Sequence, residues 1–290
     1  MVKKLSDLYL EARRAIMAVE DTQMASTLAR ELVAFAAEVD PQTVITRGDL
    51  YAGDKACQKL AECVERVVNQ EPLAYILGEW DFYGMKLYVD PHVLIPRDDT
   101  CAVTQLAIHT ALYLNAAPRI LDLCTGSGCI GLAIAHRVKD AKVTLADVSA
   151  QALVVAKKNV TTHKLGGRVS CVRADALQDP APFLGKFDMI VSNPPYITTK
   201  EMEELDRSVK DYEPHLALHG GDDGLVFYRS IAEKYAKALK PKGFLCFEFG
   251  AGQGDDVCRI LEESGYRIVE RVKDFNDRER AVLAQLGKED

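Results

Sequence analysis

The segment IVSNPPYIT, from Ile190 to Thr198, places an amide, two prolines and a tyrosine directly after an apolar run. Proline donates no backbone hydrogen bond and holds φ at about −65°, so the proline pair stiffens the turn and leaves the carbonyl of Pro194 free to accept. The side-chain oxygen of Asn193 is a second acceptor, and Tyr196 offers an aromatic face. Two fixed acceptors beside an aromatic ring suit a planar NH₂ group, which has two hydrogens to donate.

Such an arrangement of acceptors favours alkylation of an amide or aromatic amine nitrogen. The lone pair of that nitrogen is delocalised, and holding both hydrogens directs it at an electrophilic carbon while fixed positioning removes orientational freedom. No strong base is needed before the attack, because the proton can leave afterwards, and no Ser-His-Asp arrangement indicates hydrolysis. We interpret Asn193, Pro194 and Tyr196 as catalytic, and Asn193, Pro194, Pro195 and Tyr196 as substrate-binding.

A glycine-rich segment, DLCTGSGCIG, precedes this motif. Gly126, Gly128 and Gly131 satisfy the G-x-G-x-x-G spacing of dinucleotide sites, and the same spacing fits a loop that holds the amino-acid end of S-adenosylmethionine. Asp147 ends the next strand-like run, where a carboxylate accepts from ribose hydroxyls. The loop alone leaves both cofactors open, although Asp122, just before it, suits a ligand with an ammonium group better than a pyrophosphate.

After Arg97, strand-like and helical patterns alternate, as is typical of a parallel sheet with crossover helices. We predict helices over 98–115, 129–138, 149–165, 224–240 and 255–264, with Ser149 as an N-cap and Pro241-Lys242-Gly243 ending the fourth. Asn193 then follows a strand beside the glycine-loop strand, at the crevice where such sheets bind ligands. The fold expected is α/β, a doubly wound, mostly parallel seven-stranded sheet whose last two strands pair antiparallel; the seven strand-like runs are RILDLC, KVTLAD, RVSCVRAD, FDMIVSN, FLCFEFG, YRIVERVKD and RAVLAQL.

The first part of the chain has a different sequence pattern. Helical periodicity covers Leu28–Val39 and 53–72, and each segment stops at a proline. Aromatic and polar residues then alternate around Gly78 and Gly84, which indicates a hairpin. We therefore expect a helical bundle at 1–74, a β-hairpin hinge at 75–96 and an α/β domain at 97–290.

Composition narrows the function classes. The net charge of −7, from 36 basic and 43 acidic residues, does not favour direct nucleic-acid binding, which depends on clustered Lys and Arg. Neither a secretory signal nor an apolar run of about 18 residues is present, so a soluble, cytoplasmic protein without membrane contact is expected. The eight cysteines form no CxxC pair and no metal-ligand spacing, which indicates buried free thiols in a reducing compartment and no metal site.

Together, NPPY and DLCTGSG resemble the motifs of class I S-adenosylmethionine-dependent amino-methyltransferases, which include N6-adenine DNA methyltransferases and protein glutamine methyltransferases. Four further segments are similar to the release-factor glutamine methyltransferase family (PrmC/HemK): EPLAYILGEWDFYGMKLYVDPHVLIPR, VKDYEPHLALHGGDDGLVFYR, FEFGAGQ and KDFNDRERAV. The resemblance covers nearly the whole chain from about Glu71, and the bundle fits in size. The chain departs from the family at Cys124, where glycine is usual, at Asp98-Asp99 in place of Pro-Glu, and at Ala176 in place of a bulkier side chain.

This resemblance implies a Rossmann-like class I methyltransferase fold and transfer of a methyl group from S-adenosylmethionine to the amide nitrogen (N5) of the glutamine in the Gly-Gly-Gln motif of peptide-chain release factors. The bundle and the hairpin would grip the release factor. An adenine-N6 DNA methyltransferase is the alternative, since adenine presents the same NH₂ group, but the net charge weighs against it. A dehydrogenase leaves NPPY unexplained, and Asn193 and Asp147 argue against a non-catalytic module. The resemblance implies these cofactor-binding residues: Cys124, Thr125, Gly126, Ser127, Gly128, Asp147, Ala176 and Asn193.

Overall fold

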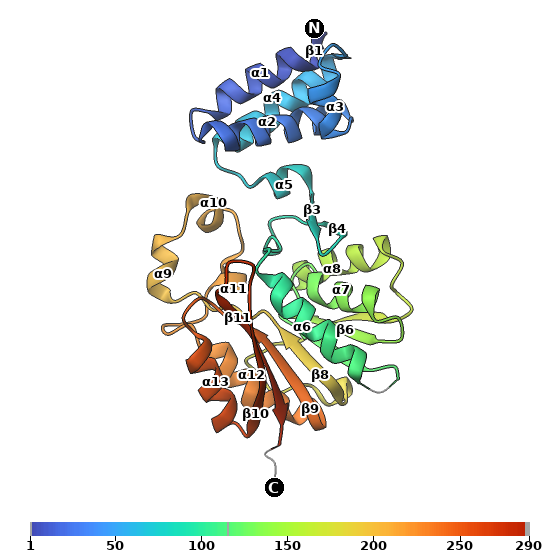
Figure 1. The fold of residues 1–290 in the computed structure, drawn as a ribbon, viewed down its shortest axis with the longest axis vertical. Coiled ribbons are helices and arrows are strands. Elements are labelled where there is room, and N and C mark those ends of the chain that lie inside the picture. Colours follow the sequence, from blue (N-terminus) through green and yellow to red (C-terminus); the bar gives the residue numbers. More distant parts are fainter. Residues whose placement is uncertain (1, 115, 288–290) are drawn as a thin grey trace. The chain divides into compact units, whose positions relative to one another are not determined.

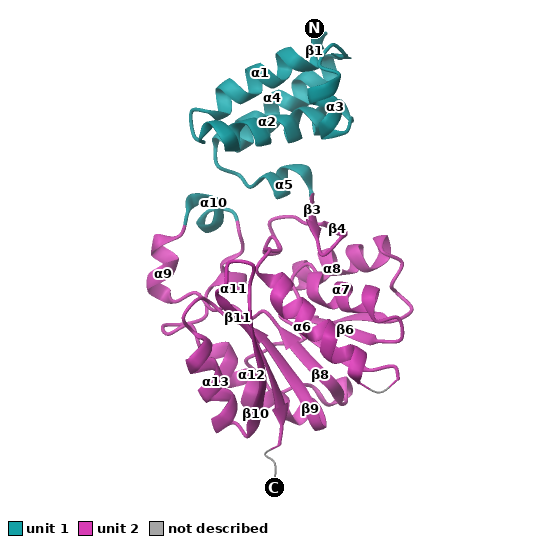
Figure 2. Ribbon diagram, in the orientation of Figure 1, with its two compact units in different colours: residues 1–78, 206–212 teal, residues 79–205, 213–290 magenta. Residues whose placement is uncertain are grey.

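The computed structural model of the chain describes residues 2–114 and 116–287 (Figure 1). Residues 1, 115 and 288–290 lie outside that description, and with them the last residue of the helix predicted over 98–115 and the outermost residues of the domains predicted at 1–74 and 97–290. The chain divides into two compact units (Figure 2): Met1–Gly78 with Asp206–Tyr212, and Glu79–Leu205 with Glu213–Asp290.

The first unit is helical. Asp21 caps the second helix by accepting from the backbone N–H groups of Gln23 and Met24, both at 2.8 Å, and Asp40 caps the third. Apolar side chains at helical spacing, such as Leu28 and Leu32, form a separate core. Its elements are β1 (Lys3–Lys4), α1 (Leu5–Ile16), α2 (Thr22–Ala37), α3 (Pro41–Thr46), β2 (Tyr51–Ala52), α4 (Asp54–Val68), α5 (Leu73–Leu77) and α10 (Arg207–Lys210).

The second unit opens with a β-hairpin, β3 (Glu79–Phe82) and β4 (Met85–Tyr88). Its two turn residues, Tyr83 and Gly84, have φ of 50° and 76°, and two positive values match the twist of antiparallel strands. Phe82, Met85 and Leu87 are buried in the core of the second unit. The hairpin therefore packs with the α/β unit.

The seven-stranded sheet of the second unit has the order β10-β11-β9-β8-β5-β6-β7. The strands from β9 to β7 are mutually parallel, while β11 is antiparallel to both β9 and β10. The predicted mostly parallel sheet and its antiparallel end pair are confirmed. The strands are β5 (Arg119–Leu123), β6 (Lys142–Asp147), β7 (Val169–Arg173), β8 (Phe187–Ser192), β9 (Leu239–Glu248), β10 (Tyr266–Lys273) and β11 (Glu279–Leu286).

Helices cover both faces of this sheet, as a doubly wound fold requires. One core cluster contains side chains from α6 (Thr100–Tyr113), α7 (Cys129–Arg137) and α8 (Ala150–Thr162). The other contains side chains from α12 (Val226–Lys234) and α13 (Gly254–Glu263). Ser149 caps α8 by accepting from the N–H of Ala152 at 3.1 Å, as predicted. The short helices are η1 (Pro182–Leu184), α9 (Thr199–Glu204), α11 (His215–Leu218) and η2 (Tyr235–Ala238).

The helix predicted over 224–240 is shorter than expected. It ends at Lys234, passes into η2, and the Pro241-Lys242-Gly243 segment lies inside β9. The proline is tolerated there because the register between β8 and β9 shifts at this point and Lys242 adopts a φ of 59°. Prolines within sheets are confined to such irregularities or to edges.

The carboxyl ends of β5 and β8 meet at one edge of the sheet, since Leu123 pairs with Ser192. The glycine loop that follows Leu123 and the N-P-P-Y segment that follows Ser192 therefore begin side by side, at the crevice expected from the sequence. Along the described stretches of the chain, every helix is too short or too polar to cross a bilayer.

Gly131, the third glycine of the loop motif, lies where α7 packs closely on β6. A Cβ at this position would come within 2.3 Å of Leu145 Cδ2, 2.9 Å of Asp122 Oδ2 and 3.0 Å of Val143 Cγ1. Close approach of helix and strand therefore requires glycine here, the packing role of this glycine in such loops.

Gly131→Ala is expected to lower the free energy of unfolding by about 1–2 kcal/mol, because overpacking against Leu145, which costs about 1–3 kcal/mol, exceeds the gain of about 1 kcal/mol in helix propensity. Gly166→Ala is the matched control, since a Cβ there meets no atom within 4 Å. Urea unfolding of both full-length variants measures the difference. Equal stability of the two variants would contradict the close packing.

Candidate active site

A cavity opens at the carboxyl ends of β5, β6 and β8, within the second unit. The glycine loop forms one wall, and the ends of β6 and β7 form another. Asn193 and Pro195 face it from the end of β8. The lining residues are His92, Val93, Leu94, Pro96, Thr100, Cys124, Thr125, Gly126, Ser127, Cys129, Ile130, Asp147, Val148, Ser149, Ala152, Ala174, Asp175, Ala176, Asn193, Pro195, Pro214, Leu216, Ala217 and Phe227.

The loop departs from an ordinary βα turn in its backbone. Cys124, Gly126 and Gly128 have φ of 61°, 53° and 86°, a region that L-residues other than Gly, Asn and Asp rarely adopt. A Cβ on Gly126 would meet no atom within 4 Å, so the backbone is open to a ligand there. Cys124 takes the left-handed conformation that explains why glycine is usual at its position, and burial raises the pKa of its thiol.

Asp147 connects the loop to the end of β6. Its Oδ2 accepts from the N–H of Gly126 and its Oδ1 from the N–H of Ser149, each at 2.9 Å. Burial raises the pKa of this carboxyl, while the backbone donors oppose the rise. Asp147 lines the cavity, so one carboxylate both holds the glycine loop and faces the ligand space.

Asp122 has a different role from the one its position suggested. Its side chain is fully buried and is absent from the cavity lining within the described chain. Oδ2 accepts from the hydroxyl of Thr125 at 2.6 Å and from the N–H of Gly131 at 2.8 Å. Burial raises the pKa of this carboxyl to about 7. Asp122 therefore braces the loop from within the sheet, and the expected preference for an ammonium ligand does not follow from it.

The N-P-P-Y segment is divided between cavity and interior. Asn193 and Pro195 line the cavity, whereas Pro194 and Tyr196 are not among its lining residues in the described chain. Tyr196 packs against the core of α12 and α13, and burial raises the pKa of its hydroxyl. Its carbonyl accepts from Gln253 Nε2 at 3.1 Å.

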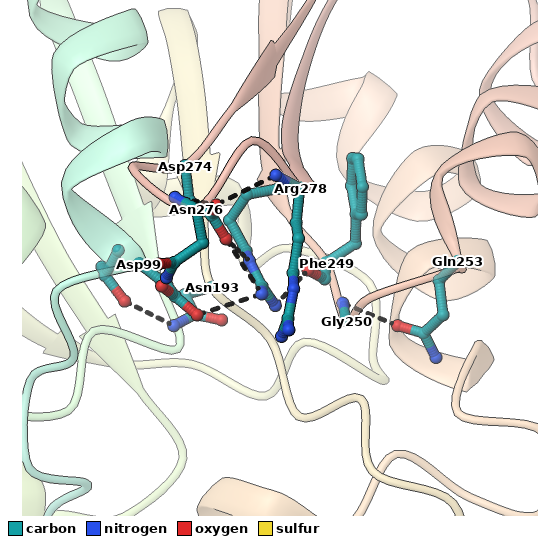
Figure 3. Close-up of polar contacts among 10 residues, drawn as sticks. Asp99, Asn193, Phe249, Gly250, Gln253, Asp274, Asn276 and Arg278 are labelled. Carbon is teal, nitrogen blue, oxygen red and sulfur yellow. Dashed lines mark hydrogen bonds and ion pairs between the residues drawn. The ribbon is translucent and has the colours of Figure 1, made fainter.

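Two further contacts hold this segment in place. Oε1 of Gln253 accepts from the N–H of Gly250 at 2.9 Å (Figure 3), which fixes the side chain that binds the Tyr196 carbonyl. A Cβ on Gly220 would lie 2.6 Å from Tyr196 Cα, so the loop around Gly220 presses directly on the segment. The substrate-binding residues predicted from the prolines are thus part of a stiff turn.

Glu213 joins two walls of the cavity. It is buried, accepts from the N–H of Ile95 at 3.2 Å and forms an ion pair with Arg97. Burial raises the pKa of its carboxyl, while Arg97 opposes the rise. Local sequence patterns give no indication of this pair, because Arg97 lies more than a hundred residues earlier in the chain.

A cluster of charged residues is centred on Arg280. The guanidinium of Arg280 pairs with Asp99 at 3.0 Å and with Asp274 at 3.2 Å, and it donates to the carbonyl of Phe249 at 3.3 Å. Asp99, part of the Asp98-Asp99 departure from the family pattern, therefore has a defined partner. Glu248 is also buried here; the sequence signals for it were its position within an apolar strand pattern and its place in the FEFGAGQ segment.

The chain matches two known protein families. The Methyltransferase small domain family matches residues 102–242, and the PrmC N-terminal domain family matches residues 7–78. A methyltransferase structure from Pyrococcus furiosus is 16% identical, with a TM-score of 0.51 over 79% of this chain and 100% of that one, a likeness of fold alone.

Two relatives are similar along most of their length. The release factor glutamine methyltransferase of Clostridium acetobutylicum is 37% identical over 269 residues, covering 93% of this chain and 92% of that protein. The release factor glutamine methyltransferase of Chlorobaculum tepidum is 43% identical over 235 residues, covering 78% of each. With an α/β methyltransferase sheet, an N-P-P-Y segment at its cavity and these relatives, the chain belongs to the release factor glutamine methyltransferase family.

Proposed function

We propose that this chain transfers a methyl group from S-adenosylmethionine to the side-chain amide nitrogen, N5, of the glutamine in the Gly-Gly-Gln motif of peptide-chain release factors in the cytoplasm. One observation carries the proposal: the pairing of Leu123 with Ser192 brings the glycine loop and the N-P-P-Y segment to the same cavity. Membership of the family supports the choice of a protein glutamine over an adenine base.

The cavity suits the cofactor. S-adenosylmethionine, when bound, supplies a methyl group on a cationic sulfur, which a weakly nucleophilic amide can attack. We assign its contacts to Cys124, Thr125, Gly126, Ser127 and Gly128 of the loop, with Asp147 at the ribose, Ala176 at the adenine and Asn193 near the methyl group. The buried hydroxyl of Ser127 has no hydrogen-bond partner among the described residues, and the small side chain of Ala176 leaves room at the lining.

Asn193 is the residue through which the substrate amide would be held. Its side-chain oxygen accepts one hydrogen of the glutamine NH₂, the carbonyl of Pro194 accepts the other, and Tyr196 stiffens the turn. These contacts orient the nitrogen lone pair without removing a proton first. Holding two reactants together in the reactive geometry can contribute about 7 kcal/mol or more in total, of which orientation is one part. The helical unit at 1–74 and the hairpin at 75–96 would bind the body of the release factor.

Asn193→Ala is expected to reduce methyl transfer to a release factor by about 10²-fold or more, because one acceptor for the glutamine NH₂ is lost. Binding of S-adenosylmethionine, measured by calorimetry, should change little. The assay uses labelled S-adenosylmethionine and the full-length chain. It compares a release factor, the same factor with the glutamine of Gly-Gly-Gln replaced by alanine, and unmethylated DNA. Label on the altered factor or on DNA alone would overturn the proposed substrate.

Asp147→Ala is expected to raise the Kd for S-adenosylmethionine about tenfold or more, since a hydrogen bond to a charged group contributes about 1.5–3 kcal/mol and the loop also loses its tie at Gly126. Asp140→Ala, an exposed residue before β6, is the matched control. Calorimetric titration of each variant measures the Kd. An unchanged Kd for Asp147→Ala would remove this residue from the cofactor site.

A further inference from the structure

Glu248 lies next to the amide-binding residue by virtue of the sheet register. It is the last residue of β9, and the residue before it, Phe247, pairs with Ser192 of β8. Because the two strands are parallel, Glu248 and Asn193 leave the sheet at the same edge. Glu248 is 1% exposed between two fully buried phenylalanines, Phe247 and Phe249. A carboxyl in such surroundings is costly unless it is paired or bonded, so its presence calls for a role.

The neighbours of the Glu248 carboxyl are hydrogen-bond donors. The hydroxyl of Thr100 and the side-chain amide of Asn193 both stabilise its charged form and so lower its pKa. Nδ2 of Asn193 also donates to Oγ1 of Thr100 at 3.4 Å. Oε2 of Glu248 is buried and has no hydrogen-bond partner among the described residues, so the carboxyl retains acceptor capacity beyond these two contacts.

These contacts determine which end of the Asn193 amide is available. A carboxylate only accepts hydrogen bonds, whereas an amide can present either an oxygen or an NH₂ group. With Nδ2 donating to Thr100 and the Glu248 carboxylate on the neighbouring strand, Oδ1 is the atom left for a ligand in the cavity that Asn193 lines. An amide turned the other way would present donors to a substrate NH₂ that itself only donates.

We propose that Glu248 is a positioning residue for methyl transfer, whose carboxylate keeps the Asn193 amide turned with Nδ2 inward and Oδ1 toward the substrate. This inference rests on the proposed function for its kinetic consequence, while the orientation of the amide is a property of the chain itself. Nothing in the role requires Glu248 to touch the substrate or the cofactor.

The charges around Glu248 make this orientation depend on pH. Burial, first, raises the pKa of Glu248 to about 7, Asp99 adds to the rise, and Arg280, which is shared with Asp99 and Asp274, opposes it. The neutral groups that sense its charge are Tyr196, Tyr228, Cys101 and Cys129, whose own pKa values are raised by burial. The positioning carboxylate therefore predominates above pH of about 7 and is lost as the pH falls through that value.

Glu248→Gln in the full-length chain tests the role, because glutamine keeps the shape and replaces an acceptor by a donor. The kcat for transfer to a release factor is expected to fall about 10²-fold, with the Kd for S-adenosylmethionine within about twofold of that of the unaltered chain. For the unaltered chain kcat/KM should rise with pH through about 7, and this limb should be absent from the variant. Glu270→Gln, on the exposed side of β10, is the control and should match the unaltered chain.

Stability separates positioning from simple structural support. A carboxyl whose pKa is higher in the folded than in the unfolded state destabilises the fold as the pH rises. The loss of stability builds up between the unfolded-state pKa and the higher folded-state pKa. Glu248→Gln removes this effect, so the melting temperature at pH 8 should be equal to or higher than that of the unaltered chain. A lower melting temperature together with weaker cofactor binding would overturn the inference in favour of a structural role.

A readout independent of activity completes the test. In chains labelled with ¹⁵N-asparagine, the side-chain NH₂ signal of Asn193, identified by its loss in Asn193→Ala, should shift with a midpoint at pH of about 7 and should not titrate in Glu248→Gln. A signal that ignores pH in the unaltered chain would overturn the inference. An unaltered chain that shows the titration but methylates no release factor would instead overturn the proposed function.

Discussion

The parallel pairing of β5 with β8 is the constraint on which the site depends. It sets Leu123 beside Ser192, and the hydroxyl of Ser192 donates to the carbonyl of Leu123 at 2.6 Å. The neighbouring pairing of β5 with β6 sets Leu123 beside Ala146, so Asp147 follows at the same edge. Three segments separated by tens of residues thus reach one cavity without any long loop, because parallel strands end together.

The features that could be predicted from the sequence are those that arise locally. Alternating strand and helix patterns predicted seven strands in a mostly parallel sheet with an antiparallel last pair, and Ser149 marked the start of α8. The crevice followed from topology, since the glycine loop and Asn193 each come directly after a strand. Gly131 was recognised by spacing, and the packing against Leu145 supplies the physical reason for it.

What could not be predicted depends on partners far away in the chain. Asp122 looked like a ligand contact, yet its strand position turns the carboxyl into the sheet, toward Thr125 and Gly131. Asp99 pairs with Arg280, about 180 residues later. Pro241 ended a helix pattern but lies in a strand, because a register shift in the adjacent pairing absorbs the missing donor. Periodicity assigns a residue to a face and says nothing of what it meets there.

Asp122 and Glu248 share the same structural features. Each is a fully or almost fully buried carboxyl on a sheet strand, each has one oxygen without a hydrogen-bond partner among the described residues, and burial raises the pKa of each to about 7. Apolar side chains of similar size would make the sheet more stable, because an incompletely bonded buried carboxyl lowers stability.

The positions of Asp122 and Glu248 indicate why these buried carboxyls are present despite the loss of stability. Asp122 bonds to both ends of the glycine loop, at Thr125 and Gly131, and Glu248 follows the residue that pairs with Ser192, beside Asn193. The glycine loop is therefore held from behind by an acceptor that belongs to the rigid sheet, and we propose the same for the segment that follows β8. Functional sites break local rules of burial for this reason. A buried carboxyl fixes the position of a cavity loop where the core would otherwise be purely apolar.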